Sequence, residues 1–174
     1  AQIQLRKPIA ALPEPAPETV ALTAAQSSAD PGAIDTSGLE QVQAGQTYRS
    51  PITGRTYAIP AEHAPNLVWW NKGSIAIAKW MAPQLIWARQ HGWDGQITSG
   101  FRTFQHQVDS QGAAVAAAPG HSNHEGSQLP RGAIDTPSYR RLRVVLQGWR
   151  GPNTLVGGGA VLSNDVVHFS KSGS

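Results

Sequence analysis

Three residues have side chains of the types that bind metal ions, and two of them stand in stretches of sequence that otherwise predict burial. Asp135 follows an apolar pair, and His168 lies between two valines and a phenylalanine. His124 lies in the turn-rich segment 119–126, where loop side chains can converge. A buried carboxylate is rare unless it is paired or binds a metal ion. Two imidazoles and one carboxylate leave the fourth position of a tetrahedral zinc ion open for water, which is the arrangement of a catalytic site.

The chain contains no cysteine, and this narrows the chemistry further. A disulfide framework, a thiol nucleophile and a zinc site with Cys ligands are all excluded. A metal ion would therefore be held by His, Asp or Glu alone. Among the remaining histidines, His63, His91 and His106 have no such setting, and we expect them to be ordinary surface or core residues.

Three segments resemble, in the same order, the motifs of a known enzyme family. Ser99–Gln107 (SGFRTFQHQ) resembles the SGYRS…Q segment of D-alanyl-D-alanine metallopeptidases. Ser122–Gly126 (SNHEG) with Asp135 resembles their SxHxxG…D zinc motif, and Asp165–His168 (DVVH) resembles their closing acid-x-x-His motif. This family contains carboxypeptidases and phage endolysins of the lysostaphin/D-Ala-D-Ala-metallopeptidase/hedgehog fold group. The resemblance covers roughly residues 66–170.

The resemblance implies a zinc ligand set and a general base. His124, Asp135 and His168 would bind Zn²⁺, which would polarise the scissile amide and activate a water molecule. Asp165 would take a proton from that water and pass it to the leaving amine.

The resemblance also implies the residues that contact substrate. Arg102 would hold a substrate carboxylate through its planar guanidinium, and would polarise the scissile carbonyl. Gln107 and Ser122 would line the substrate cleft.

Two features depart from the family pattern. Asp135 lies eleven positions after His124, farther than is usual, and we expect Ser127–Arg131 to loop out at the rim of the cleft. Asp165 stands where Glu is commoner, and it is shorter by one methylene. A spacing of three would place Asp165 and His168 on opposite faces of a flat strand, so a turn or bulge must intervene.

Other residues near the motifs offer alternatives. Glu125, beside a predicted ligand, could serve as the base in place of Asp165. His121 could replace His124 as a ligand if the register of the loop differs. The cluster Arg140, Arg141 and Arg143 is expected to be a solvated helix face rather than a surface that binds the cell wall.

The elements that must position these residues predict a small α+β domain. Its small antiparallel sheet would carry the zinc site and would be flanked by helices. The expected elements are a hairpin in 46–60, a helix over 75–89 ending at Gly92 and interrupted by Pro83, a strand at 96–99, helices over 103–117 and 138–149, and strands at 155–161 and 166–170.

The first 45 residues read as an extended Pro/Ala-rich tether, and residues 46–174 as the metallopeptidase domain. The tether carries two basic and five acidic side chains, whereas the domain carries twelve basic and six acidic ones. Such a basic domain suits nucleic acid, an anionic membrane surface or a bacterial cell wall. Aromatic residues are not interleaved with the basic ones, which disfavours nucleic acid. No apolar run is long enough to predict a membrane span.

These observations together predict zinc-dependent hydrolysis of a peptide bond in peptidoglycan stem peptides. The bond would be D-alanyl-D-alanine-type, cut by a carboxypeptidase or endopeptidase, or the L-alanyl-D-glutamate bond. The enzyme would be an extracytoplasmic bacterial protein or a phage wall hydrolase. Its N-terminal tether would attach it to a larger assembly. The chain opens at Ala1 without Met, as a processed product or an excised fragment would. The alternative is a non-catalytic wall-binding or structural module on the same fold.

Overall fold

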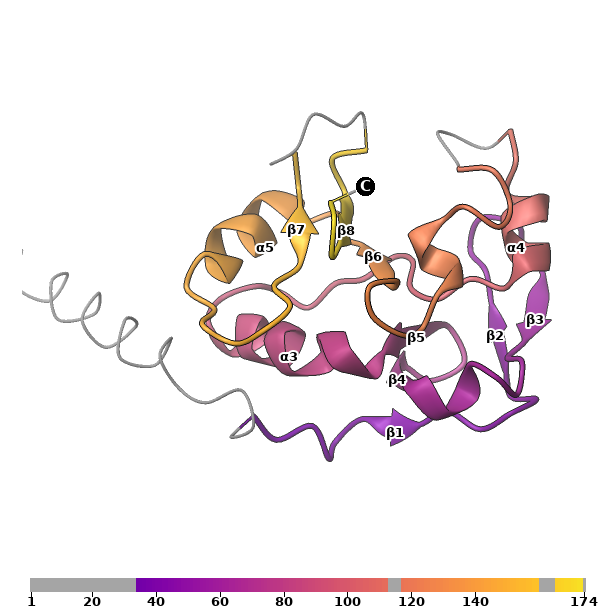
Figure 1. Cartoon of the computed structure of the whole chain (residues 1–174), viewed down its shortest axis with the longest axis horizontal. Helices are drawn as coiled ribbons and strands as arrows, with labels where there is room; N and C mark the ends of the chain where they lie inside the picture. The colour runs from indigo at the N-terminus through magenta and orange to yellow at the C-terminus, as the bar shows by residue number, and fades with distance from the viewer. Residues whose placement is uncertain (1–33, 113–116, 160–164, 174) are drawn as a thin grey trace, which may run out of the picture.

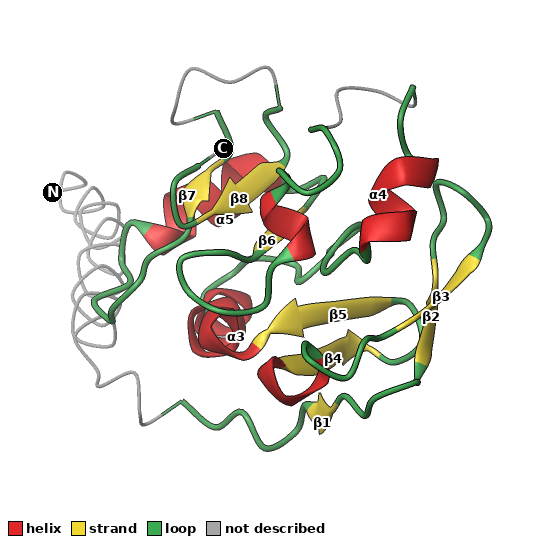
Figure 2. Cartoon of the chain, turned by 45° about the vertical axis from the view of Figure 1, so that its right-hand side comes forward, coloured by secondary structure: helices red, strands yellow, loops and turns green. Residues whose placement is uncertain are grey.

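The computed structural model describes residues 34–112, 117–159 and 165–173, which form an α+β fold with three small antiparallel sheets (Figure 1). The predicted fold class is thereby confirmed, whereas tether residues 1–33 lie outside the described residues. Two views place the hairpin of β2 (Thr47–Arg49) and β3 (Thr56–Ala58) together with α4 (Phe104–Asp109) at one end of the domain (Figures 1 and 2). The sheet of β6 (Ala133–Asp135), β8 (His168–Ser170) and β7 (Val156–Gly157) lies away from that end. No helix in the described ranges is long and apolar enough to cross a membrane.

The first sheet has the order β1-β4-β5, with strands Glu40–Gln41, Leu67–Asn71 and Ile75–Ala78. Strand β5 is buried along its whole length, as are four of the five residues of β4. Strand β1 pairs with β4, and the following Val42 is 2% exposed. The folded part therefore begins before residue 46 and includes residues that the sequence assigned to the tether. A two-residue edge strand is too short to give a recognisable pattern in the sequence.

The predicted helix over 75–89 is wrong in its first half. Residues 75–78 form strand β5, a short 3-10 helix η4 follows at Lys79–Met81, and helix α3 spans Ala82–Gln90. Pro83 lies in the first turn of α3, where a backbone N–H is not needed, so it begins the helix rather than kinking it. Gly92 follows with φ of 106°, the left-handed conformation that ends the helix as predicted.

The hairpin predicted within 46–60 is confirmed as β2, Thr47–Arg49, paired with β3, Thr56–Ala58. Helix α4 is shorter than predicted, spanning Phe104–Asp109, and residues 113–116 of the expected helix lie outside the described part. The expected strand at 96–99 supplies only a single bridge, from Ser99 to Asp135.

The third sheet has the order β6-β8-β7, with strands Ala133–Asp135, His168–Ser170 and Val156–Gly157. Helix α5, Tyr139–Leu146, lies within the predicted 138–149 and buries Leu142 and Leu146. The two predicted C-terminal strands form in shortened versions, and residues 160–164 lie outside the described ranges. The arginines of α5 are exposed, as expected: Arg140, Arg141 and Arg143.

His106 joins the hairpin to α4 as a buried core residue. The Thr103 amide donates to the Tyr48 hydroxyl over 3.0 Å, and that hydroxyl lies 2.8 Å from His106 Nδ1, so it donates to the imidazole. The Tyr57 ring stacks on the imidazole at 4.5 Å. Burial lowers the pKa of His106 to about 4, because this apolar setting disfavours the charged ring. The neutral imidazole is thus part of the packing.

We therefore predict that stability falls as the pH is lowered from 6.5 towards about 4. The unfolded state binds a proton on His106 in this window and the folded state does not, so the free energy of unfolding decreases by up to about 3 kcal/mol. Urea unfolding of the parent chain and His106→Gln across this range checks it. The difference between the two should shrink as the pH falls, and parallel curves would contradict the assignment.

Candidate metal centre

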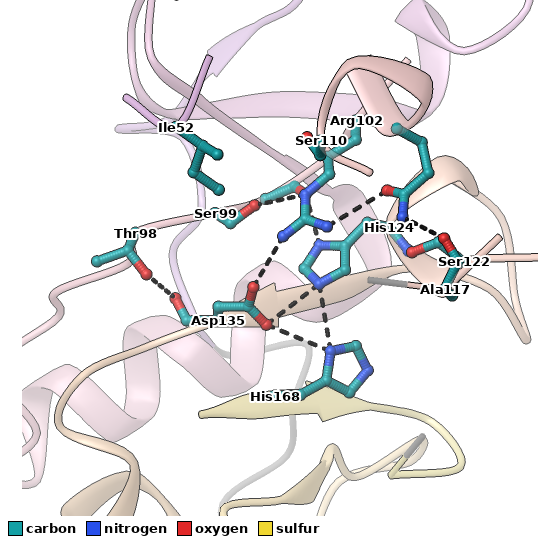
Figure 3. Close-up of polar contacts among 12 residues, drawn as sticks. Ile52, Thr98, Ser99, Arg102, Ser110, Ala117, Ser122, His124, Asp135 and His168 are labelled. Atoms are coloured by element: carbon teal, nitrogen blue, oxygen red, sulfur yellow. Dashed lines mark hydrogen bonds and ion pairs between the residues drawn. The ribbon is translucent and has the colours of Figure 1, made fainter. Parts of the chain in front are cut away.

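Three buried side chains from separate elements converge on one point. His124 Nε2 lies 3.1 Å from Asp135 Oδ1 and 3.2 Å from His168 Nδ1, and the last two atoms lie 3.3 Å apart (Figure 3). None of the three residues is more than 8% exposed. The described residues thus contain one compact group of His and Asp that can hold a metal ion.

The spacing of the three ligand atoms fits a small divalent ion. A tetrahedral ion bound at about 2.0–2.1 Å from each ligand sets the ligand atoms about 3.3 Å apart. The observed separations of 3.1, 3.2 and 3.3 Å match one face of such a tetrahedron. The donor set, two imidazole nitrogens and one carboxylate oxygen, also suits zinc.

Backbone pairing places two of the three side chains. Asp135 and His168 are direct partners in the antiparallel register of β6 and β8, which sets them side by side on one face. Residues 166–167 form a turn, and the His168 amide donates to the Asp165 carbonyl over 3.3 Å. The turn that the three-residue spacing required is therefore present.

The third ligand is placed by a capped 3-10 helix, η5, at Asn123–Glu125. The Ser122 hydroxyl accepts the His124 amide, and the Glu125 carboxylate accepts the amides of Gly120 and Ser122. These reciprocal bonds form a capping box, which fixes the backbone just before the ligand. The carboxylate of Glu125 is directed at its own loop, which argues against the alternative that Glu125 is the base.

A backbone carbonyl fixes the tautomer of His124. Its Nδ1 donates to the Gly100 carbonyl over 2.8 Å, so the lone pair of Nε2 faces the other two ligands. A Cβ at Gly100 would collide with the Ala76 carbonyl, so only glycine allows this close approach. Because the partner is a main-chain oxygen, no side-chain pattern could have indicated it.

The side chain of Arg102 forms an ion pair with Asp135, a member of the candidate metal centre. Its Nη2 lies 3.0 Å from Asp135 Oδ2, its Nε donates to Ser99 Oγ over 2.9 Å, and its Nη1 lies 3.3 Å from Gln107 Oε1 (Figure 3). Arg102 as a whole is 8% exposed, so it is a buried residue. The sequence predicted that Arg102 grips a substrate carboxylate, but here it pairs with the carboxylate of a ligand. Arg102 contacts Oδ2 of Asp135 and thereby orients the carboxylate, whose Oδ1 faces His124 and His168.

Gln107 and Ser122 also have internal partners instead of open positions in a cleft. Gln107 is 0% exposed, accepts from Arg102 and donates to the Ala117 carbonyl over 2.8 Å. Ser122 is 5% exposed and caps η5. The sequence predicted that both line the substrate cleft; in the structure both are buried and support the site through these hydrogen bonds.

Electrostatics favour the metal-binding forms of Asp135 and His124. Burial acts to raise the pKa of Asp135, but His124, His168 and Arg102 outweigh it and hold that pKa well below its ordinary value. Burial lowers the pKa of His124, which keeps its imidazole neutral at pH 7. An ionised carboxylate and a neutral imidazole are the states that a metal ion requires.

Asp165 lies half-buried beside the three ligands. Burial, followed by the charge of Asp135, raises the pKa of Asp165 above its ordinary value, and the other groups that act on it are His168, His124 and Arg102. Its carboxylate therefore belongs to the same electrostatic cluster. His121, the alternative ligand, is exposed and is not part of the group.

Comparisons of the chain with protein-family models, with curated proteins and with solved structures returned no match.

The position of Arg102 predicts an effect on metal affinity. Replacing it as Arg102→Gln frees the Asp135 carboxylate to rotate and should lower the affinity for Zn²⁺ by about 10–100-fold. Competition with a chromophoric chelator measures this, with thermal unfolding to verify the fold. Arg140→Gln, on the exposed face of α5, is the matched control and should bind as the parent does. Equal affinity in both variants would refute the positioning role.

Proposed function

We propose that the chain is a zinc-dependent peptidase acting on peptidoglycan stem peptides. The observation that carries the proposal is the buried group of His124, Asp135 and His168 with Asp165 beside it. Two imidazoles and one carboxylate would hold Zn²⁺, and an ion so bound polarises an amide carbonyl and promotes ionisation of water. The resemblance of the three ordered motifs to D-alanyl-D-alanine metallopeptidases supports the choice of substrate.

In this proposal Asp165 is the general base. Its carboxylate accepts a proton from the attacking water and returns it to the amine that leaves when the C–N bond breaks. The raised pKa of Asp165, caused by burial and by the charge of Asp135, makes its carboxylate a stronger base than an ordinary aspartate, which favours its taking a proton. Asp165 is one methylene shorter than the Glu that is commoner at this position. In this proposal the turn at 166–167, which precedes β8, brings its carboxylate near the ligands.

The other chain residues act on the ligands. Arg102 and the Gly100 carbonyl hold Asp135 and His124 in place, so that the site is preorganised before the substrate arrives. The scissile bond is of the D-alanyl-D-alanine type, or the L-alanyl-D-glutamate bond. We place the enzyme outside the cytoplasm or on a phage particle, where the N-terminal segment joins a larger assembly.

The role of Asp165 predicts that Asp165→Asn lowers hydrolysis by about 10²–10⁴-fold, since the amide cannot accept the proton. Zinc affinity should stay close to that of the parent, because Asp165 is not a ligand. Defined muropeptides incubated with the full chain, followed by chromatography and mass spectrometry, identify the bond and give the rate.

Asp35→Asn serves as the control and should leave the rate unchanged, because this exposed carboxylate bonds to Ser37 within its own turn. Undiminished hydrolysis by Asp165→Asn would remove this residue from the mechanism. A parent chain that binds zinc and cuts no muropeptide would instead favour the non-catalytic module.

A further inference from the structure

A separate cavity of about 210 Å³ adjoins the candidate metal centre. Arg102 contributes to its wall, and Arg102 also contacts Asp135, so the cavity and the ligands share one residue. Phe101 and Phe104 give it an apolar side, the first buried and the second 60% exposed. A cavity in this position can hold a part of the peptide next to the reacting bond.

Arg131 supplies the cation in this cavity. It belongs to the extra segment Ser127–Arg131, and its side chain packs across Gly126, where a Cβ would collide with it. One Nη2–H donates to the Ser122 carbonyl, which holds the guanidinium in place. Within the described ranges Arg131 makes no ion pair, in contrast to Arg102. Its remaining N–H groups can therefore bind a carboxylate.

Neither of the two acidic residues in the wall forms an ion pair with Arg131. The Glu125 carboxylate accepts the Gly120 amide over 2.9 Å and the Ser122 amide over 3.1 Å, so it is satisfied by its own loop. Glu62 is exposed, where water screens its charge, and it forms no ion pair with Arg131.

His63 offers a second polar contact. Its Nδ1 lies 2.7 Å from Ser127 Oγ, and its ring packs against Phe101 at 4.8 Å between centroids. Burial lowers the pKa of His63, so its imidazole is neutral at pH 7 and contributes a hydrogen bond instead of a charge. A cation held beside a neutral imidazole and an aromatic wall suits a carboxylate on a small apolar group.

We propose that this cavity is the subsite for a free carboxylate of the peptide substrate, and that Arg131 determines this specificity. The inference rests on the proposed peptidase function. In this inference the residue that binds the substrate carboxylate is Arg131 of the extra segment. Arg102, which the sequence predicted for this role, is paired with Asp135. The carboxylate comes either from the C-terminus of the peptide or from an acidic side chain.

The test measures binding to the zinc-loaded full chain carrying Asp165→Asn, so that the probes are not consumed. One pair of probes is N-acetyl-D-alanyl-D-alanine and its C-terminal amide. The other is N-acetyl-L-alanyl-D-isoglutamine, which has only a side-chain carboxylate, and its fully amidated counterpart. Calorimetric titration gives the preference for acid over amide within each pair, and the pair that shows it identifies the source.

We expect the acid to bind about 10-fold or more tightly than the amide in one pair, from charge-assisted hydrogen bonds. Arg131→Gln should abolish this preference, and Arg131→Lys should retain part of it, because a lysine keeps the charge and loses the planar fork. Arg140→Gln is the control and should retain all of it. Thermal unfolding shows whether each variant is folded.

Absence of an acid preference in both pairs would overturn the subsite, and so would a preference that survives Arg131→Gln. Failure of the wider proposal looks different. If the preference depends on Arg131 while the parent chain cuts no muropeptide, the subsite stands and the peptidase function falls. If the parent cuts muropeptides but Arg131 has no effect on the preference, only the subsite is wrong.

Discussion

The burial of one charged carboxylate, Asp135, is the constraint on which the rest of the structure depends. It is 8% exposed, and an ionised group so placed is tolerated only with partners on every side. Its Oδ1 faces His124 and His168, and its Oδ2 faces Arg102. Each partner comes from a different segment, so this single charge ties together the sheet of β6 and β8, the helix η5 and the loop before α4.

The remaining elements hold these partners in place. Gln107 on α4 bonds to the guanidinium of Arg102, and His106 on the same helix is bonded to Tyr48 of the hairpin. The Ala76 carbonyl of β5 accepts the Phe101 amide over 2.7 Å, and this hydrogen bond positions the peptide unit whose Gly100 carbonyl faces His124. The hairpin and the first sheet thus act on the candidate centre without contributing a ligand, through residues one contact removed from it.

The sequence singled out His124, Asp135 and His168, and the structure brings these three residues together. Asp135 and His168 are polar within apolar stretches, and β pairing is enough to bring them together. The role of Arg102 could not be predicted, since a guanidinium suits a substrate carboxylate and a ligand carboxylate equally. The prediction of a helix over 75–89 was wrong in its first half for a related reason. Ile75 and Ala78 satisfy a helical period and also fit a fully buried strand, and only pairing with β4 decides between them.

Elemental analysis of the purified full chain is the most direct test of the central claim, that His124, Asp135 and His168 hold a catalytic zinc ion. The account predicts about one zinc ion per chain in the parent, none in His124→Ala, and full content in His121→Ala, whose exposed imidazole lies three residues away. Absence of metal in the parent even after zinc is added, or equal content in the two variants, would contradict it.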